Sequence, residues 1–173
     1  MNTSQVEAAR LGALRSYGIL DSPNEPDFDD IVQDARRLLS VPIALISLVD
    51  EHRQWFKARA GLEVSETPRC ILFCTHALRG SSILTIPDAR KDERFASNPL
   101  VSGEPHIRFY AGAPLTVSNG RRVGTLCVID TKPRSGLSTG QEELLAALAA
   151  RTMEAMERRK ARIDSMLTST ARL

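Results

Sequence analysis

The sequence is poor in cysteine and has no long hydrophobic run. Its three cysteines are an odd number, which argues against a disulfide-stabilised secreted domain and fits a reducing compartment. The longest apolar run, residues 41–49, is interrupted by Pro42 and Ser47 and is too short to span a bilayer. The amino terminus also lacks the continuous apolar stretch of a secretion signal. We therefore expect a cytoplasmic protein that does not insert into a membrane.

An excess of charge of one sign is also missing. The chain has 23 Lys and Arg against 21 Asp and Glu, so its net charge of +2 gives no general case for nucleic-acid binding. The basic cluster at 158–162 has Glu154 and Glu157 one helical turn away, which predicts a solvated helix end. There is no glycine-rich phosphate loop, nucleophile elbow or zinc-protease motif, so the enzyme classes that these motifs define are not indicated.

What is present is the composition of an ordinary globular domain. Hydrophobic residues make up 42% of the chain and charged residues 25%. A chain of 173 residues can bury a sizeable core without a metal or disulfide. We therefore treat residues 1–173 as a single domain.

Residues 107–130 give the clearest structural signal, a β-hairpin. Two apolar, β-prone runs flank Asn119 and Gly120, which favour a two-residue turn and would place Thr116 opposite Val123. Neither face of this hairpin is polar. One face would carry Ala111, Ala113, Leu115, Leu126 and Val128, and the other Tyr110, Gly112, Thr116, Val123, Thr125, Cys127 and Ile129. Such a strand pair belongs in the middle of a domain and is covered on both sides.

The remaining elements follow from apolar spacing. Helices are predicted over 6–17, 28–39 and 139–167, the last one with Ser138 and Gln141 as its capping box. Strands are predicted over 43–50, 54–60 and 83–86, a short helix over 71–78, and loops over 62–69 and 87–106. The apolar residues of the second loop indicate that it folds back over the domain. The late turns of the long helix keep an apolar stripe (Met156, Ile163 and Leu167), as in a helix that meets a partner helix.

Cysteine and histidine offer the main candidates for chemistry. Cys70, Cys74 and His76, with the distant Cys127, form the only cluster of metal-ligand type, but Cys74 and His76 would diverge on a helix. We expect buried thiols and no metal. Thiol catalysis is a weaker alternative.

Charged and aromatic residues form a second group of candidates. Asp88 and Arg108 flank segments that could line a pocket, where they would orient a polar ligand or instead tie down the loop. The aromatic residues Trp55, Phe73, Phe95, Phe109 and Tyr110 are core residues first and ligand walls second, with Tyr110 the best wall candidate.

Several segments together resemble a GAF domain, of the bacterial type found beside diguanylate cyclases and histidine kinases. They are LGALRSYGILDSPNEPDFDDIV, VPIALISLVDEHRQWFKARAGL, FCTHAL, IPDARKDERFASNPLV, IRFYAGAPL and GTLCVID, and they cover roughly residues 11–155. The resemblance implies an α+β, PAS-like fold. A central antiparallel sheet of about six strands would carry the terminal helices on one face, while the short helix and the long loop would cover a pocket on the other.

The resemblance also implies a function. GAF domains are mostly ligand sensors or dimerisation modules, so we expect a small-molecule sensor that relays its signal through terminal helices at a homodimer interface to an effector protein. The ligand-binding candidates are Trp55, Phe73, Cys74, His76, Asp88, Phe95, Arg108, Tyr110 and Cys127. No catalytic residue, metal or cofactor is assigned, and the ligand is unknown. The alternatives are a ligand-free dimerisation module and, more weakly, an enzyme like free methionine-R-sulfoxide reductase, whose cysteine spacing this chain does not reproduce. The cysteine-histidine pair of bilin-binding relatives is also interrupted here by Thr75.

Overall fold

The computed structural model describes residues 2–69, 73–80 and 82–172. Six strands of this part of the chain form one antiparallel sheet in the order β3-β2-β1-β6-β5-β4. The strands are β1 (Ile43–Val49), β2 (Arg53–Ala60), β3 (Glu66–Pro68), β4 (Leu84–Ile86), β5 (Phe109–Thr116) and β6 (Arg122–Asp130). The helices are α1 (Thr3–Arg15), α2 (Pro26–Leu38), α3 (Cys74–Ala77), the 3-10 helix η2 (Ala89–Lys91), α4 (Pro99–Ser102) and α5 (Thr139–Thr170). The expected α+β fold is confirmed.

Both faces of the sheet are apolar and covered. All seven residues of β1 are buried. Ala44, Ile46 and Leu48 pack in the cluster beneath the helices, whereas Ile43 and Leu45 pack in a second cluster on the opposite face. The alternation of side chains along a strand therefore makes β1 a wall shared by two cores.

The central hairpin forms, but its turn is longer than predicted. Leu115 pairs with Gly124 as expected, and a bulge then shifts the register so that Thr116 pairs with Arg122 instead of Val123. The Val117 amide donates to Arg121, which leaves a three-residue loop in which Gly120 has a φ of +83°. A three-residue loop ending in a left-handed glycine is a common hairpin connection. The shift also moves Val123 to the helix-side core, contrary to the prediction.

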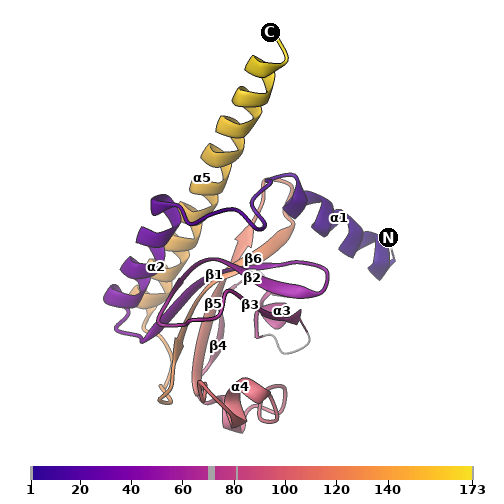
Figure 1. Cartoon of the computed structure of the whole chain (residues 1–173). Helices are drawn as coiled ribbons and strands as arrows, with labels where there is room; N and C mark the ends of the chain where they lie inside the picture. Colours follow the sequence, from indigo (N-terminus) through magenta and orange to yellow (C-terminus); the bar gives the residue numbers. More distant parts are fainter. Residues whose placement is uncertain (1, 70–72, 81, 173) are drawn as a thin grey trace.

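Helices α2 and α5 lie side by side on one face of the sheet, while α3 and α4 lie on the other (Figure 1). The predicted stripe of α2 is buried through Phe28, Ile31, Val32 and Ala35, although Leu38 is exposed. The amino-terminal helix α1 contributes Leu14 to the same core. None of the described helices is long and apolar enough to cross a membrane.

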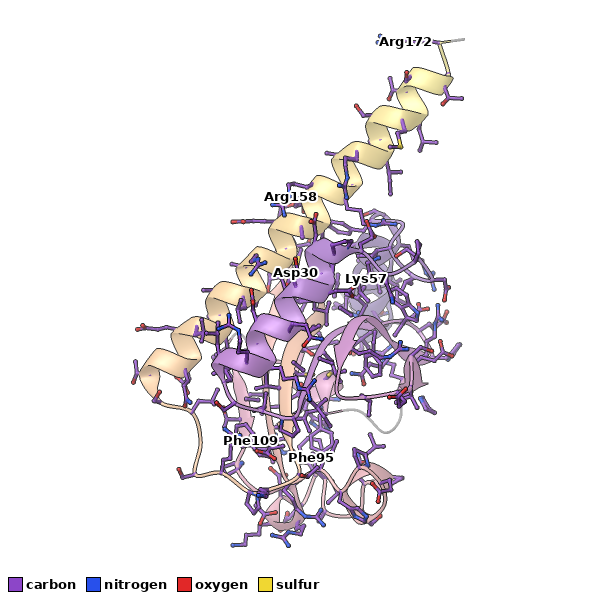
Figure 2. The ribbon with its side chains drawn as sticks, turned by 60° about the vertical axis from the view of Figure 1, so that its left-hand side comes forward. Asp30, Lys57, Phe95, Phe109, Arg158 and Arg172 are labelled. Carbon is purple, nitrogen blue, oxygen red and sulfur yellow. The ribbon has the colours of Figure 1, made fainter. Side chains whose placement is uncertain are left out.

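The last helix is longer than the body of the domain needs. Its 32 residues span about 48 Å. The capping box of Ser138 and Gln141 forms as predicted, and the helix is buried as far as Met156. Its contacts with the body continue through Arg159 and Arg162, which both pair with Glu25, and the helix then projects towards Arg172 (Figure 2).

Two segments predicted as loops contain regular structure. Within 62–69, Glu66–Pro68 forms the edge strand β3 against Arg53–Trp55 of β2. The sequence of this strand is polar and therefore gave no signal for a strand. Within 87–106, η2 and α4 form a lid, with Asn98 capping α4. Phe95 and Val101 of this segment are buried, which confirms that it folds back over the domain.

Candidate functional site

A small cavity lies between the sheet and its lid. Its volume is about 50 Å³. Most of its walls are apolar, and Gln54, Thr67, Cys74, Tyr110 and Cys127 supply the polar atoms. The apolar lining comes from the sheet, from the connection between β2 and β3, from the N-cap of α3, and from α4 and the segment that follows it: Ile43, Leu45, Phe56, Ile129, Leu62, Val64, Phe73, Leu100, Pro105 and Ile107. The arrangement suits a small molecule with little charge.

Stacked aromatic rings cover one side of the cavity. The ring of Phe73 lies 4.3 Å from that of Phe95, nearly parallel to it, and 5.1 Å from that of Tyr110. His76 meets the edge of Phe95 at 5.0 Å. These contacts join α3, the lid and β5 into one layer, so opening the cavity wider requires the Phe73 ring to move.

The floor of the cavity holds a buried sulfur surrounded by hydrogen-bond donors. Cys74 Sγ accepts from Gln54 Nε2 and Thr125 Oγ1 at 3.0 Å each, and it lies 3.3 Å from the Tyr110 hydroxyl. A Cβ atom on Gly112 would lie 2.3 Å from that hydroxyl. Glycine at 112 is therefore what lets the Tyr110 side chain lie along its strand and reach Cys74.

The two buried thiols have opposite ionisation tendencies. Burial raises the pKa of Cys74, but hydrogen bonding with Cys127, Thr125 and Tyr110, together with the nearby Ser47 hydroxyl, outweighs it and holds that pKa below the usual thiol value. The interaction with Cys74, together with burial, raises the pKa of Cys127. Burial first, and then the two nearby thiols, raise the pKa of Tyr110. Cys74 is therefore the group in this cluster that ionises first.

Four of the nine predicted site residues line the cavity, namely Phe73, Cys74, Tyr110 and Cys127. Two others, His76 and Phe95, lie behind Phe73 in the aromatic layer. The neighbouring Cys70 lies outside the described residues.

The structure places the other three predicted residues outside the lining of the cavity. Trp55 packs in the core beneath the helices, and Phe56 faces the cavity in its place. The pairing of β1 with β2 contains a bulge next to these residues. Asp88 caps η2 and pairs with Arg90. Arg108 donates to the carbonyls of Val101 and Ile107 and so ties the lid down, which is the second of the two roles expected for it.

Sequence reasoning missed two polar residues of the cluster, Gln54 and Ser47. Both are buried, Gln54 in β2 at 5% exposure and Ser47 in the otherwise apolar β1 at 0%. A polar side chain that a strand buries needs a partner, and this was the signal available in the sequence. Among the described residues, no group of three or more His, Cys, Asp or Glu side chains is placed to hold a metal ion.

Comparison with known proteins identifies the family. The GAF domain family model matches residues 25–156. The chain belongs to the GAF domain family. GAF domains are signalling domains of the sensor type, generally with a regulatory role.

A curated relative and two solved structures agree with this assignment. A cyclic di-GMP phosphodiesterase of Pseudomonas aeruginosa is 42% identical over 147 residues, which are 85% of this chain and 25% of that protein. The chain thus spans about a quarter of the length of this relative. The GAF domain of an Acinetobacter phosphoenolpyruvate-protein phosphotransferase is similar at a TM-score of 0.66 and 24% identity, covering 93% of this chain and 97% of that one. A free methionine-R-sulfoxide reductase of Neisseria meningitidis, solved with its substrate, is similar at 0.64 and 12% identity, covering 94% and 96%. At these identities the two solved structures show the shared fold alone.

Proposed function

We propose that this GAF domain is the sensory unit of a signalling protein, and that it binds a small molecule in the cavity between the sheet and the lid. The observation that carries the proposal is the cavity itself, because its floor strands also form the helix-side core. A molecule bound there touches the same strands that support α2 and α5.

The size and lining of the cavity define the ligand class. Pockets for drug-sized ligands have roughly 300–1,000 Å³, whereas this one has about 50 Å³. No charged side chain lines it among the described residues. We therefore propose an uncharged ligand of a few heavy atoms; a nucleotide would require the lid to open.

Polar contacts, most of them partly buried, would couple the sheet to the part of α5 that leaves the body of the domain. Arg159 of α5 donates to the carbonyls of Tyr17 and Gly18 and pairs with Glu25 at 2.7 Å. Glu25 also pairs with Lys57 of β2. A ligand that binds two arrangements of this contact set unequally would shift α5, and a ligand that binds both equally would transmit nothing.

The free part of α5 supports a homodimer. Met166 and Leu167 are exposed at 67% and 65%, and they continue the helix beyond the body with Ile163. An apolar stripe on a projecting helix is typical of pairing with a second helix. We propose that two copies pair there and that the receiving effector, in the same protein or in another, is an enzyme such as the phosphodiesterase of the relative. The domain itself would have no catalytic role.

Thermal-shift screening of small uncharged metabolites tests the sensing proposal. A ligand at 100 times its dissociation constant should stabilise the domain by about 2.7 kcal/mol. Ile129→Phe fills the cavity and should abolish the shift, whereas Met153→Phe on the helix side should preserve it. Failure of the whole screen, or a shift that survives Ile129→Phe, would count against binding in this cavity.

A ligand-free dimerisation module is the second candidate. It is favoured by the small volume of the cavity, about 50 Å³, beside the stacked rings of Phe73, Phe95 and Tyr110. A dimer that forms by sedimentation in wild type and is lost in Leu167→Glu, with no ligand found, would support this candidate.

A further inference from the structure

Two buried thiols from distant parts of the sequence meet beneath the cavity. Cys74 comes from α3 and Cys127 from the middle of β6, two residues from Thr125, whose hydroxyl donates to Cys74 Sγ at 3.0 Å. Residues two apart on a strand share a face, so the Cys127 side chain lies on the side of β6 that meets Cys74. Both line the cavity. A single buried cysteine is an ordinary core residue, but two neighbouring thiols can form a bond with each other.

The surroundings of Cys74 favour a sulfur anion. Gln54 and Thr125 donate to its Sγ, and the Tyr110 hydroxyl is also within reach. Ser47 Oγ is fully buried and has no partner at bonding distance among the described residues, yet it lies near enough to Cys74 to lower the pKa of the thiol. A neutral thiol is a weak acceptor, so this many donors around one sulfur stabilise the thiolate far better than the thiol.

We propose that Cys74 is a modification site for small hydroperoxides and that Cys127 resolves the product as a disulfide. This inference rests on the proposed function because the cavity must admit a small molecule. It deepens that function by assigning the chemical class of the molecule.

The reaction balances with a hydroperoxide as the oxidant. The Cys74 thiolate attacks the distal oxygen, the O–O bond breaks, and the leaving oxygen takes up a proton to give an alcohol, or water from hydrogen peroxide. Cys74 is thereby oxidised by two electrons to a sulfenic acid. The Cys127 sulfur then attacks Cys74 Sγ, the S–O bond breaks, and the oxygen leaves with the Cys127 proton as water. In sum, two thiols and one hydroperoxide give one disulfide, one alcohol and one water.

The ionisation states and the dimensions of the site suit this order of events. Cys74 ionises more readily than Cys127, which keeps the proton that the second step releases. The titratable groups facing Cys74 are Cys127 and Tyr110, while His76 on the same helix packs on Phe95 instead.

The cavity is open to solvent at one end. Val64 lines the cavity and is 49% exposed, so it lies at the mouth. Hydrogen peroxide is uncharged and fits a volume of about 50 Å³, whereas glutathione does not.

Peptide mass spectrometry after treatment with hydrogen peroxide tests the proposal. Wild type and a Cys70→Ser variant are used, because Cys70 is a third cysteine outside the described residues. We expect a linkage between the peptides of Cys74 and Cys127 that dithiothreitol reverses. In Cys70→Ser/Cys127→Ser, dimedone should trap a sulfenic acid at Cys74. The proposal is overturned if Cys74 stays reduced while free glutathione in the same tube is oxidised, or if Cys127 alone is modified.

The donors of Cys74 give a second readout. Thr125→Val removes one hydrogen bond to the sulfur, so the pH at half-maximal oxidation rate should rise by about one pH unit. The control Thr152→Val changes a buried threonine of α5 whose hydroxyl donates to the Leu148 carbonyl on the helix side of the sheet, and it should leave this pH unchanged. Equal profiles for both variants would contradict a stabilised thiolate.

The outcomes separate this inference from the proposed function. Reversible ligand binding with an unreactive Cys74 would refute the modification site and leave the sensing proposal standing. Oxidation of Cys74 in a protein that gives no ligand-induced thermal shift would support the modification site and refute reversible sensing.

Discussion

The side chain of Lys57, with its ammonium group, is completely buried, at 0% exposure. It donates to Ser22 Oγ, to the carbonyl of Pro23 and to the Glu25 carboxylate, and it lies 5.2 Å from the centre of the Phe28 ring. A buried charge is tolerated only while its partners remain. Lys57 of β2 therefore holds the part of the α1–α2 connector from Ser22 to Glu25 in place.

Removing the acceptor should harm the protein more than removing the charge. Glu25→Ala leaves the Lys57 ammonium buried with only neutral acceptors and should lower the free energy of unfolding by roughly 2–3 kcal/mol. Lys57→Met removes the charge itself and should cost less, because Glu25 keeps Arg159. Urea unfolding measures both, with the surface pair variant Asp34→Ala, expected to cost under about 1 kcal/mol, as the control. A greater loss in Lys57→Met than in Glu25→Ala would contradict this account.

Glu7 predicts a stability change in acid. The hydrogen bond from Arg10, followed by that from Arg69 and opposed by partial burial, lowers the pKa of Glu7 to about 2. A carboxylate with a lowered pKa adds stability above its unfolded pKa of about 4.3 and loses it as the pH falls towards the folded value. Between pH 5 and pH 2, wild type should therefore lose more free energy of unfolding than Glu7→Gln does, by roughly 1–2 kcal/mol after solvent screening. Parallel curves for the two proteins would show that Glu7 contributes nothing.

At the scale of elements, the long helix should depend on its cap. Ser138 Oγ accepts from the Gln141 amide, and the Gln141 side chain accepts from the Ser138 amide. Ser138→Ala should lower the free energy of unfolding by about 1 kcal/mol. Ser165→Ala, at an exposed position of the same helix, should change it by less than about 0.5 kcal/mol. Equal effects in thermal or urea unfolding would mean that the cap is not used.

Elements with a strong apolar period were predictable from the sequence, and those without one were not. The stripe of α2, the run of β1 and the Asn119-Gly120 signal each identified an element, because burial of one or both faces fixes which residues are apolar. The edge strand at 66–68 carries no such signal, since a strand paired on one side need not be apolar. The site was only partly predictable for a related reason. A single bulge decides whether Trp55 or Phe56 faces the cavity, and no local pattern marks that bulge.

At the scale of the whole molecule, the chain separates a folded body from a projecting helix. Residues 164–172 are exposed throughout. Ending the chain after Arg162 preserves the contact of Arg162 with Glu25 and removes Ile163, Met166 and Leu167. The shortened protein should unfold within about 1 kcal/mol of the full chain at low concentration, because it loses few buried contacts.

The same truncation should remove the dependence of unfolding on protein concentration. If copies pair through the free part of α5, the full chain gains stability as its concentration rises, and the shortened chain does not. Unfolding midpoints over a concentration series measure this. The outcome against the pairing would be a full chain whose midpoint is independent of concentration.

Strand β1 has paired strands on both edges and a packed core on both faces. Its amide hydrogens therefore have no route to solvent short of unfolding of the entire domain, and their deuterium uptake should be the slowest in the chain. The deuterium uptake of β1 is thus an internal reference for the rate of global unfolding. If ligand or oxidant changes the deuterium uptake of another segment while the uptake of β1 stays the same, that segment has opened or closed locally in a protein that stays folded.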